Sequence, residues 1–247
     1  MAKSAKKKPT RGKAPSKKSA TLHEKRFPNE NAGYRSARNA LLKAEIGLRR
    51  EIERVAALRR KLPAGGVIRE DYVFEEMGAG GEKRRVKLSQ LFGDKNSLIV
   101  YGFMYGPAMK NACPSCSSII DALDRESKHI NQRVPIVAVA RSPIERVESL
   151  RRERGWSGIR FLSSANNNYN RDYFTEDEKG GQQPILNVFL RKNGNIHHFY
   201  STELSFVPAE KGQHARHVDM IWPLWNALDY TPEGRGTDWG PRLNYDA

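Results

Sequence analysis

Two cysteines are the residues of this chain best suited to do chemistry. Cys113 and Cys116 are the only cysteines among the 247 residues, and Pro114 and Ser115 stand between them. The apolar run that begins at Ser97 predicts a buried strand before the pair, and apolar residues at helical spacing predict a helix after it. Proline suits the first turn of a helix, where its missing N–H is not needed. The pair is therefore expected at the junction of a strand and a helix.

This position predicts different roles for the two thiols. A thiolate at a helix N-terminus meets unpaired backbone N–H groups and the positive end of the helix dipole. The pKa of Cys113 should therefore fall below the usual value of about 8.5, which makes Cys113 the expected nucleophile. Cys116, one turn into the helix, would resolve a mixed disulfide formed on Cys113.

Two other interpretations of the cysteine pair remain open. The pair could be half of a metal site completed by histidines, for which the sequence offers His197, His198, His214 and His217. A four-thiolate zinc site is excluded because the chain has no further cysteine. The cysteines could also be two small buried side chains without a reactive role. We expect no metal and no cofactor.

Composition indicates a folded chain outside the membrane. Hydrophobic residues make up 38% of the sequence and charged residues 29%. Two cysteines argue against a disulfide-stapled secreted scaffold. No stretch approaches the about 18 apolar residues of a membrane span, and the charged N-terminus lacks the apolar stretch of a signal peptide. A cytoplasmic location without membrane contact is expected.

The net charge of +15 is concentrated at the N-terminus. Residues 1–26 hold ten Lys or Arg and one acidic residue, so they carry +9 and leave +6 for the other 221 residues. Residues 1–31 are expected to be a disordered Lys-rich tail, because their first part has no large apolar side chain to bury. The tail could contact nucleic acid or another polyanion weakly, or it could be a solvating tail without a partner.

Residues 32–64 predict an amphipathic helix. Leu41, Leu48, Val55 and Leu62 recur every seven residues and form a narrow apolar stripe on a highly charged helix. The stripe is expected to pack either on the chain's own domain or on a second copy in a homodimer.

Residues 65–247 predict alternating strands and helices, which is the order of a thioredoxin-like α/β domain. A β-α-β unit implies parallel strands joined by a right-handed crossover, and a hairpin would complete a mixed sheet with helices on both faces. The expected elements are short strands near 73 and 86, strands from 97, at 134–140 and at 159–162, a helix at 144–155 with solvated arginines, a mobile excursion at 176–183, a hairpin turned at Asn193-Gly194, and a last helix over 218–228 in which Pro223 makes a kink or begins the second half.

A proline before the third core strand of such a domain faces the dithiol, and Pro184 occupies that position. We expect a cis peptide bond at Pro184, which would leave nearby backbone free to pair with an extended substrate. The alternative is an ordinary proline at a strand edge. Pro184 and Pro114 are the expected substrate contacts.

Ten short stretches, among them Phe-Met-Tyr-Gly-Pro and Cys-Pro-Ser-Cys-Ser, carry a resemblance to a known family. From about residue 34 to 235 the chain resembles the bacterial thioredoxin-like family called domain of unknown function 899. The resemblance implies a thioredoxin-like fold with a Cys-Pro-x-Cys pair and no settled substrate. Gly102 stands where relatives are expected to carry histidine. The matching stretches are residues 59–63, 71–74, 103–107, 113–117, 137–143, 155–156, 168–170, 188–191, 200–202 and 229–232.

Three functions follow as hypotheses. The first is thiol–disulfide exchange with a disulfide-bearing protein or a small thiol, although no acidic residue is evident as a buried proton acceptor. The second is peroxide reduction through a sulfenic acid on Cys113, although the Pro-x-x-x-Thr-x-x-Cys pattern of peroxiredoxins is absent. The third is a non-catalytic binding module that uses the helix, the basic tail and the aromatic C-terminal segment.

Overall fold

The computed structural model describes residues 22–208, 210–211, 219–236 and 238–245. Most of the expected Lys-rich tail, residues 1–21, lies outside the described residues, as do His214 and His217. The chain divides into two units, residues 1–61 and 62–247. Within the described ranges, no helix has both the length and the apolar composition needed to cross a membrane.

The predicted N-terminal helix is present as α1 (Ala32–Arg60). Asn31 caps it, because the Asn31 side chain accepts a hydrogen bond from the Tyr34 amide at 2.8 Å. Arg59 and Arg60 lie in the last turn, where cations suit the helix dipole. α1 ends before the predicted limit of residue 64, and none of its side chains is buried.

The second unit is built on one seven-stranded sheet in the order β2-β1-β5-β4-β3-β6-β7. β3 pairs in parallel with β4, and β4 in parallel with β5, whereas β6 is antiparallel to β3 and β7 antiparallel to β6. The β1–β2 hairpin joins the sheet at β5. The strands are β1 (Val73–Met77), β2 (Lys83–Lys87), β3 (Ser97–Gly102), β4 (Ile136–Ala140), β5 (Arg160–Ser163), β6 (Leu186–Lys192) and β7 (Asn195–Ser201).

Helices and short 3-10 turns connect these strands. They are η1 (Leu88–Phe92), α2 (Pro114–Ile130), α3 (Ile144–Glu153), α4 (Tyr169–Asp172), η2 (Leu204–Phe206), η3 (Asp219–Ile221) and α5 (Pro223–Leu228). The dithiol helix α2 follows the interior strand β3, which has a parallel neighbour on one side and an antiparallel neighbour on the other. This strand order confirms the predicted thioredoxin-like mixed sheet.

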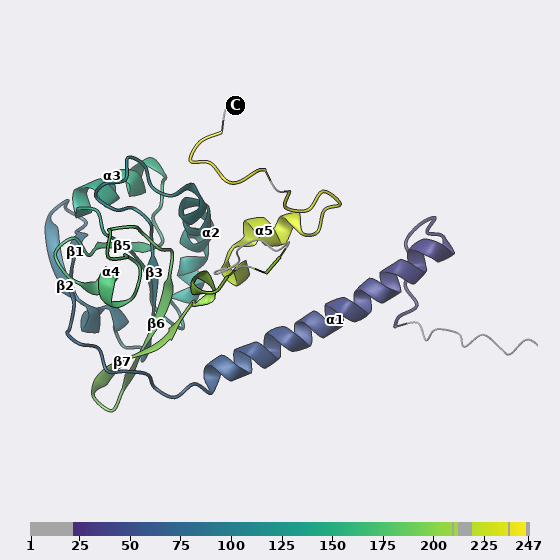
Figure 1. Ribbon diagram of the computed structural model, residues 1–247, viewed down its shortest axis with the longest axis horizontal. Helices are drawn as coiled ribbons and strands as arrows, with labels where there is room; N and C mark the ends of the chain where they lie inside the picture. The colour runs from purple at the N-terminus through teal and green to yellow at the C-terminus, as the bar shows by residue number, and fades with distance from the viewer. Residues whose placement is uncertain (1–21, 209, 212–218, 237, 246–247) are drawn as a thin grey trace, which may run out of the picture. The chain divides into compact units, whose positions relative to one another are not determined.

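Both faces of the sheet are buried, and the alternation along β4 shows why. Ile136, Ala138 and Ala140 face a cluster that contains residues of α2, α3 and α5, whereas Val137 and Val139 face a second cluster with residues of η1 and α4. In Figure 1 α2 can be seen alongside β3. A strand buried on both sides reads as a continuous apolar run, as this one does.

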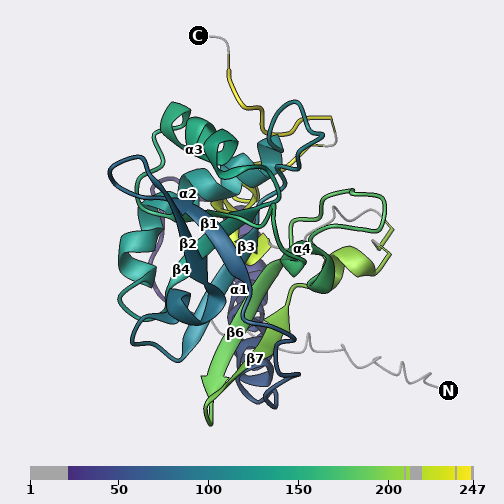
Figure 2. The ribbon, with the colours of Figure 1, turned by 90° about the vertical axis from the view of Figure 1, so that its left-hand side faces the viewer.

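The predicted hairpin is formed by β6 and β7 and can be followed along its length in Figure 2. Asn193 and Gly194 at its tip have φ values of 52° and 79°. A two-residue turn with both residues in the left-handed region matches the twist of the flanking strands, and asparagine and glycine adopt that region most readily.

Two segments differ from expectation. Residues 176–183, expected to be a mobile excursion, form a turn closed by a bridge between Glu176 and Gln182, and the Asp177 carboxylate accepts hydrogen bonds from the Lys179 and Gly181 amides. The expected last helix is divided. The 3-10 turn η3 comes first and the helix α5 follows it. Pro223 lies in the first turn of α5, so the prediction that this proline begins the second half is confirmed.

Candidate dithiol site

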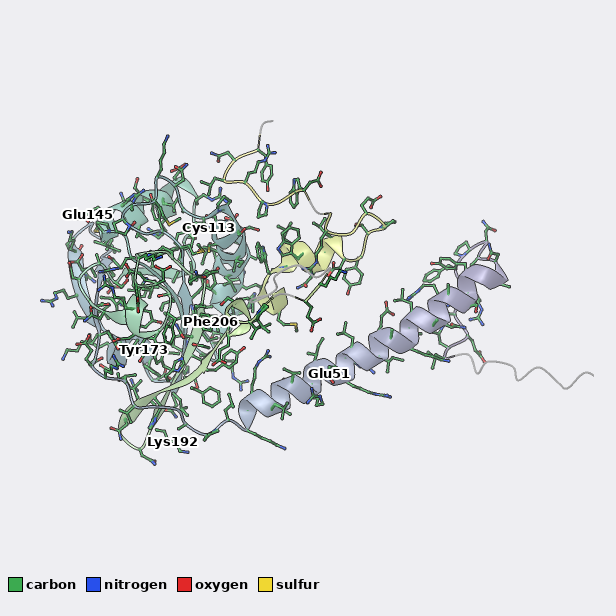
Figure 3. All side chains as sticks on the ribbon, viewed as in Figure 1. Glu51, Cys113, Glu145, Tyr173, Lys192 and Phe206 are labelled. Carbon is green, nitrogen blue, oxygen red and sulfur yellow. The ribbon has the colours of Figure 1, made fainter. Side chains whose placement is uncertain are left out.

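The structure places Cys113 as the N-cap residue of α2, with Pro114 in the first turn. The Cys113 amide donates to the Met104 carbonyl at 3.0 Å, and the Cys113 carbonyl accepts from the Ser117 amide at 3.0 Å. The first bond ties the cysteine to the segment after β3, and the second begins the helix. Figure 3 labels Cys113 beside α2. The predicted junction of strand and helix is therefore present.

The two sulfurs lie in different surroundings. Cys113 is half-buried, whereas only 1% of Cys116 is exposed, and both are free thiols. A hydrogen bond from the Cys116 thiol, together with the amides of Cys116 and Ser115, lowers the pKa of Cys113 to about 6 against the opposing effect of burial. Burial and the neighbouring Cys113 sulfur raise the pKa of the Cys116 thiol.

This arrangement separates the functions of the two thiols. The lowered pKa favours the thiolate form of the half-buried Cys113, and the raised pKa favours the protonated form of the buried Cys116. Thiolate is the nucleophilic form of cysteine, so Cys113 can attack a disulfide while Cys116 is held in reserve.

A tyrosine that the sequence did not single out also reaches the dithiol. Tyr101, on β3, is fully buried in the apolar cluster that contains Cys116 and Phe103. The nearby Cys116 sulfur contributes to the raised pKa of the Tyr101 hydroxyl, after burial itself. Strand alternation places Tyr101 on the same face of β3 as Ile99, two residues earlier, which marks it as a core residue but not as a functional one.

Arg146 of α3 holds the loop that leads from β3 to Cys113. Its guanidinium donates to the carbonyls of Gly106 at 3.3 Å, Pro107 at 3.2 Å and Lys110 at 2.9 Å, and also to that of Met109. The same guanidinium stacks over the Tyr105 ring, 4.2 Å from its centroid. The expectation that this arginine is simply solvated is wrong, because four loop carbonyls need a donor.

The 175–182 segment covers the ends of β3 and β4. Glu176 is 8% exposed and pairs with Arg141, which follows β4, at 3.0 Å. A Cβ atom on Gly102 would lie 2.6 Å from the Thr175 methyl carbon and 3.0 Å from the Ile185 carbonyl oxygen. Gly102, which stands where a histidine was expected in relatives, therefore allows Thr175 and Ile185 to approach β3 closely.

The expected cis peptide bond at Pro184 is wrong, because the described peptide bonds are all trans. Ile185, the next residue, accepts a hydrogen bond from the Gly102 amide at 2.8 Å. Pro184 therefore lies beside the C-terminal end of β3, the end from which the chain leads to the dithiol. Pro114, the other expected substrate contact, stands between the cysteines in the first turn of α2.

The histidines proposed as metal ligands have other partners where they can be seen. His197 bonds to the Gly65 carbonyl at 2.9 Å, and His198 bonds to Ser201 at 2.9 Å and Asn187 at 3.2 Å. In the part of the chain that the structure describes, no three His, Cys, Asp or Glu side chains gather as a metal site would require.

Comparison with known proteins gives a family match over most of the chain. The family model described as "Bacterial protein of unknown function (DUF899)" matches residues 24–246. Comparison with curated proteins gave no match.

Several solved structures align with the chain at low similarity. Plasmodium yoelii thioredoxin peroxidase I aligns with a TM-score of 0.44 and 18% identity over 68% of this chain and 91% of that one. Enterococcus faecalis AhpC aligns with a TM-score of 0.43 and 14% identity over 67% of this chain and 93% of that one. Because these TM-scores are below 0.5, the fold assignment depends on the strand order given above.

Proposed function

The chain belongs to the bacterial family of unknown function DUF899, and we propose that it is a thiol–disulfide oxidoreductase whose reacting pair is Cys113 and Cys116. One observation carries the proposal. A half-buried thiol begins a helix, and a buried thiol one turn later is the largest influence that lowers its pKa to about 6. A structural pair of cysteines needs neither the lowered pKa nor the access to solvent.

The reaction proceeds in two balanced exchanges. The Cys113 thiolate attacks one sulfur of a substrate disulfide, a new S–S bond forms on Cys113, and the other substrate sulfur leaves as a thiolate that takes a proton. Cys116 then loses its proton and attacks the Cys113 sulfur, which releases the second substrate thiol. The substrate gains two electrons and two protons, and the protein is left with a Cys113–Cys116 disulfide.

Substrate contacts are proposed at the C-terminal end of β3. Pro114 lies in the same helix turn as the reacting sulfur, and Pro184 begins the approach to β6 beside that end of the sheet. A disulfide-bearing polypeptide in an extended conformation would suit backbone of this kind.

The proposal is tested with a protein disulfide such as that of insulin and an excess of small-molecule dithiol. We expect the parent protein to accelerate reduction and Cys113→Ser to be inactive. When the small-molecule dithiol is left out, Cys116→Ser should accumulate a mixed disulfide between Cys113 and substrate, which mass spectrometry detects, because no resolving thiol is present. A parent that gives no acceleration, or a Cys113→Ser variant as active as the parent, would rule the proposal out.

Peroxide is the competing oxidant for the same thiolate. Cys113 would then form a sulfenic acid, and Cys116 would condense with it to give the same disulfide and water. Hydrogen peroxide consumption, measured beside disulfide reduction under the same conditions, separates the two activities. Much faster turnover of peroxide than of the disulfide would assign the pair to peroxide reduction.

A further inference from the structure

One buried hydroxyl in the described part of the chain lacks the partner that its environment demands. The Tyr101 hydroxyl is wholly enclosed and has no hydrogen-bond partner among the described residues. The other deeply buried tyrosines differ, since the Tyr72 hydroxyl donates to Asp172 at 2.6 Å and the Tyr169 hydroxyl accepts from Asn187 at 3.3 Å. A buried polar group without a hydrogen-bond partner lowers the stability of the fold. A tyrosine at this position therefore needs an explanation, and function is one.

The group beside this hydroxyl is the resolving thiol. Tyr101 acts on the Cys116 sulfur and lowers its pKa, whereas burial and Cys113 raise it, and Cys113 and Tyr101 are the titratable side chains with an effect on Cys116. The two groups influence each other's pKa, yet no hydrogen bond of normal geometry satisfies the Tyr101 hydroxyl. In the dithiol state Cys116 is a neutral thiol, and a neutral thiol sulfur is only a weak hydrogen-bond acceptor.

Cys116 needs a hydrogen-bond donor once Cys113 has formed a mixed disulfide. Cys113 then carries no negative charge, and Cys116 must become a thiolate inside an apolar cluster that includes Ile119 and Phe103. An ion in such surroundings needs a hydrogen-bond donor. The Met104 backbone supplies one favourable contact, and Tyr101 carries the side-chain donor that is not otherwise used.

We propose that the Tyr101 hydroxyl donates a hydrogen bond to the Cys116 thiolate in the resolving step and is thus a catalytic residue of the second exchange. This inference depends on the proposed oxidoreductase function. Tyr101 keeps its proton throughout. The proton of Cys116 ends on the substrate sulfur that leaves when Cys116 attacks Cys113, so the S–S bond to substrate breaks as the Cys113–Cys116 bond forms.

The contact itself is tested by titrating Cys116 in the absence of Cys113. The thiolate absorbance of Cys113→Ser is compared with that of Cys113→Ser combined with Tyr101→Phe. We expect the second protein to have the higher pKa at Cys116, with about tenfold less thiolate at a given pH below both values. Equal titration curves would show that the hydroxyl does not stabilise the thiolate, whatever the protein's activity.

The kinetic role is tested with an aromatic disulfide that releases one coloured thiolate when Cys113 attacks and a second when Cys116 resolves. Tyr101→Phe should leave the first release unchanged and slow the second. Tenfold less thiolate, partly offset by the greater nucleophilicity of a more basic thiolate, gives a rate about three- to tenfold lower. An unchanged second release would overturn the proposal. A parent without a second release would instead overturn the oxidoreductase function.

Tyr169→Phe is the matched control. It removes a buried hydroxyl from the cluster on the other face of the sheet and should leave both releases unchanged. It should also destabilise the fold, because the Asn187 amide loses its acceptor, whereas Tyr101→Phe removes an unpartnered group and should not. A Tyr101→Phe protein that unfolds more easily than Tyr169→Phe would assign Tyr101 to stability and contradict the proposal.

Discussion

The pKa values of the two cysteines shift in opposite directions because α2 begins at one of them. Cys113 stands before the first helical residue, where the Cys116 thiol and the amides of Cys116 and Ser115 lower its pKa. Cys116 lies one turn further along, inside the apolar cluster. A spacing of three residues therefore separates the pair into a half-buried thiol of lowered pKa and a buried thiol of raised pKa.

The hydrogen bond from Cys116 is the largest influence on Cys113, which gives a prediction for single residues. Cys116→Ala removes the donor and should raise the pKa of Cys113 from about 6 toward the usual value of about 8.5. Cys116→Ser keeps a hydroxyl donor and should raise the pKa less. The pH dependence of Cys113 alkylation measures both. Equal pKa values in Cys116→Ala and the parent would show that the helix amides alone stabilise the thiolate.

The sequence predicted the cysteines but not the residues that serve them. The Cys-Pro-x-Cys spacing after an apolar run is a local pattern, so it can be read directly. Tyr101 and Arg146 act across the fold, and nothing in their own neighbourhoods distinguishes them from a core aromatic and a surface cation. The cis bond expected at Pro184 is wrong, and that expectation came from the position of the proline in the fold and not from a local sequence pattern.

At the scale of elements, α3 fixes the loop that presents the dithiol. Arg146 projects from the first turn of α3 and binds four carbonyls between Gly106 and Lys110, so that helix, loop and Tyr105 form one unit. Bonds from a cation to backbone carbonyls are stronger than neutral ones, and the planar guanidinium reaches several carbonyls together. The loop thereby enters α2 in one defined direction.

Arg146→Met should loosen this loop. The loss of several charge-assisted bonds should lower the free energy of unfolding by about 2 kcal/mol, and misplacement of Cys113 should slow disulfide exchange about tenfold. Arg152→Met is the control on the same helix, because its pairing with Glu148 leaves 66% of its side chain exposed and should matter by less than about 1 kcal/mol. Denaturant unfolding and exchange rates measure the two effects. Indistinguishable behaviour of the variants would contradict this role for Arg146.

Some pairings of elements could be predicted from the sequence and others could not. The apolar runs and the Asn-Gly turn located β3, β4, β6 and β7, because each pattern lies within its own segment. The junction of β1 with β5 could not be seen, since it depends on one Cα partnership, Glu75 with Ser163, and on an ion pair between Glu76 and Arg160 at 2.5 Å. Contacts between residues so far apart in the sequence produce no periodic pattern within either segment.

At the scale of the molecule, the chemistry belongs to residues 62–247. The groups that act on the two cysteines all lie in this unit, from Tyr101 to Cys116. The other unit contributes α1, and of the apolar stripe Leu41 and Leu48 are exposed whereas Val55 is half-buried. A single helix cannot bury its own apolar stripe. The stripe of α1 is therefore a matter of packing, whereas the dithiol is a matter of thiol chemistry.

Deleting residues 1–61 should therefore leave the thiol chemistry intact. We expect the pKa of Cys113 and the rate of disulfide exchange to stay within about twofold of the full chain, because sites without shared partners act independently. Stopped-flow exchange with the aromatic disulfide checks this, and the full chain is the control. A large loss of rate in the shortened protein would show that the first unit contributes to the site.

The account as a whole depends on Cys113 being a thiolate at neutral pH. The most direct test is the alkylation rate of Cys113 in the reduced full-length protein, followed by mass spectrometry of the peptide that contains it, between pH 4 and pH 10. The account predicts a single rise with its midpoint near the pKa of about 6. A midpoint near about 8.5, as in an unfolded cysteine, would contradict it.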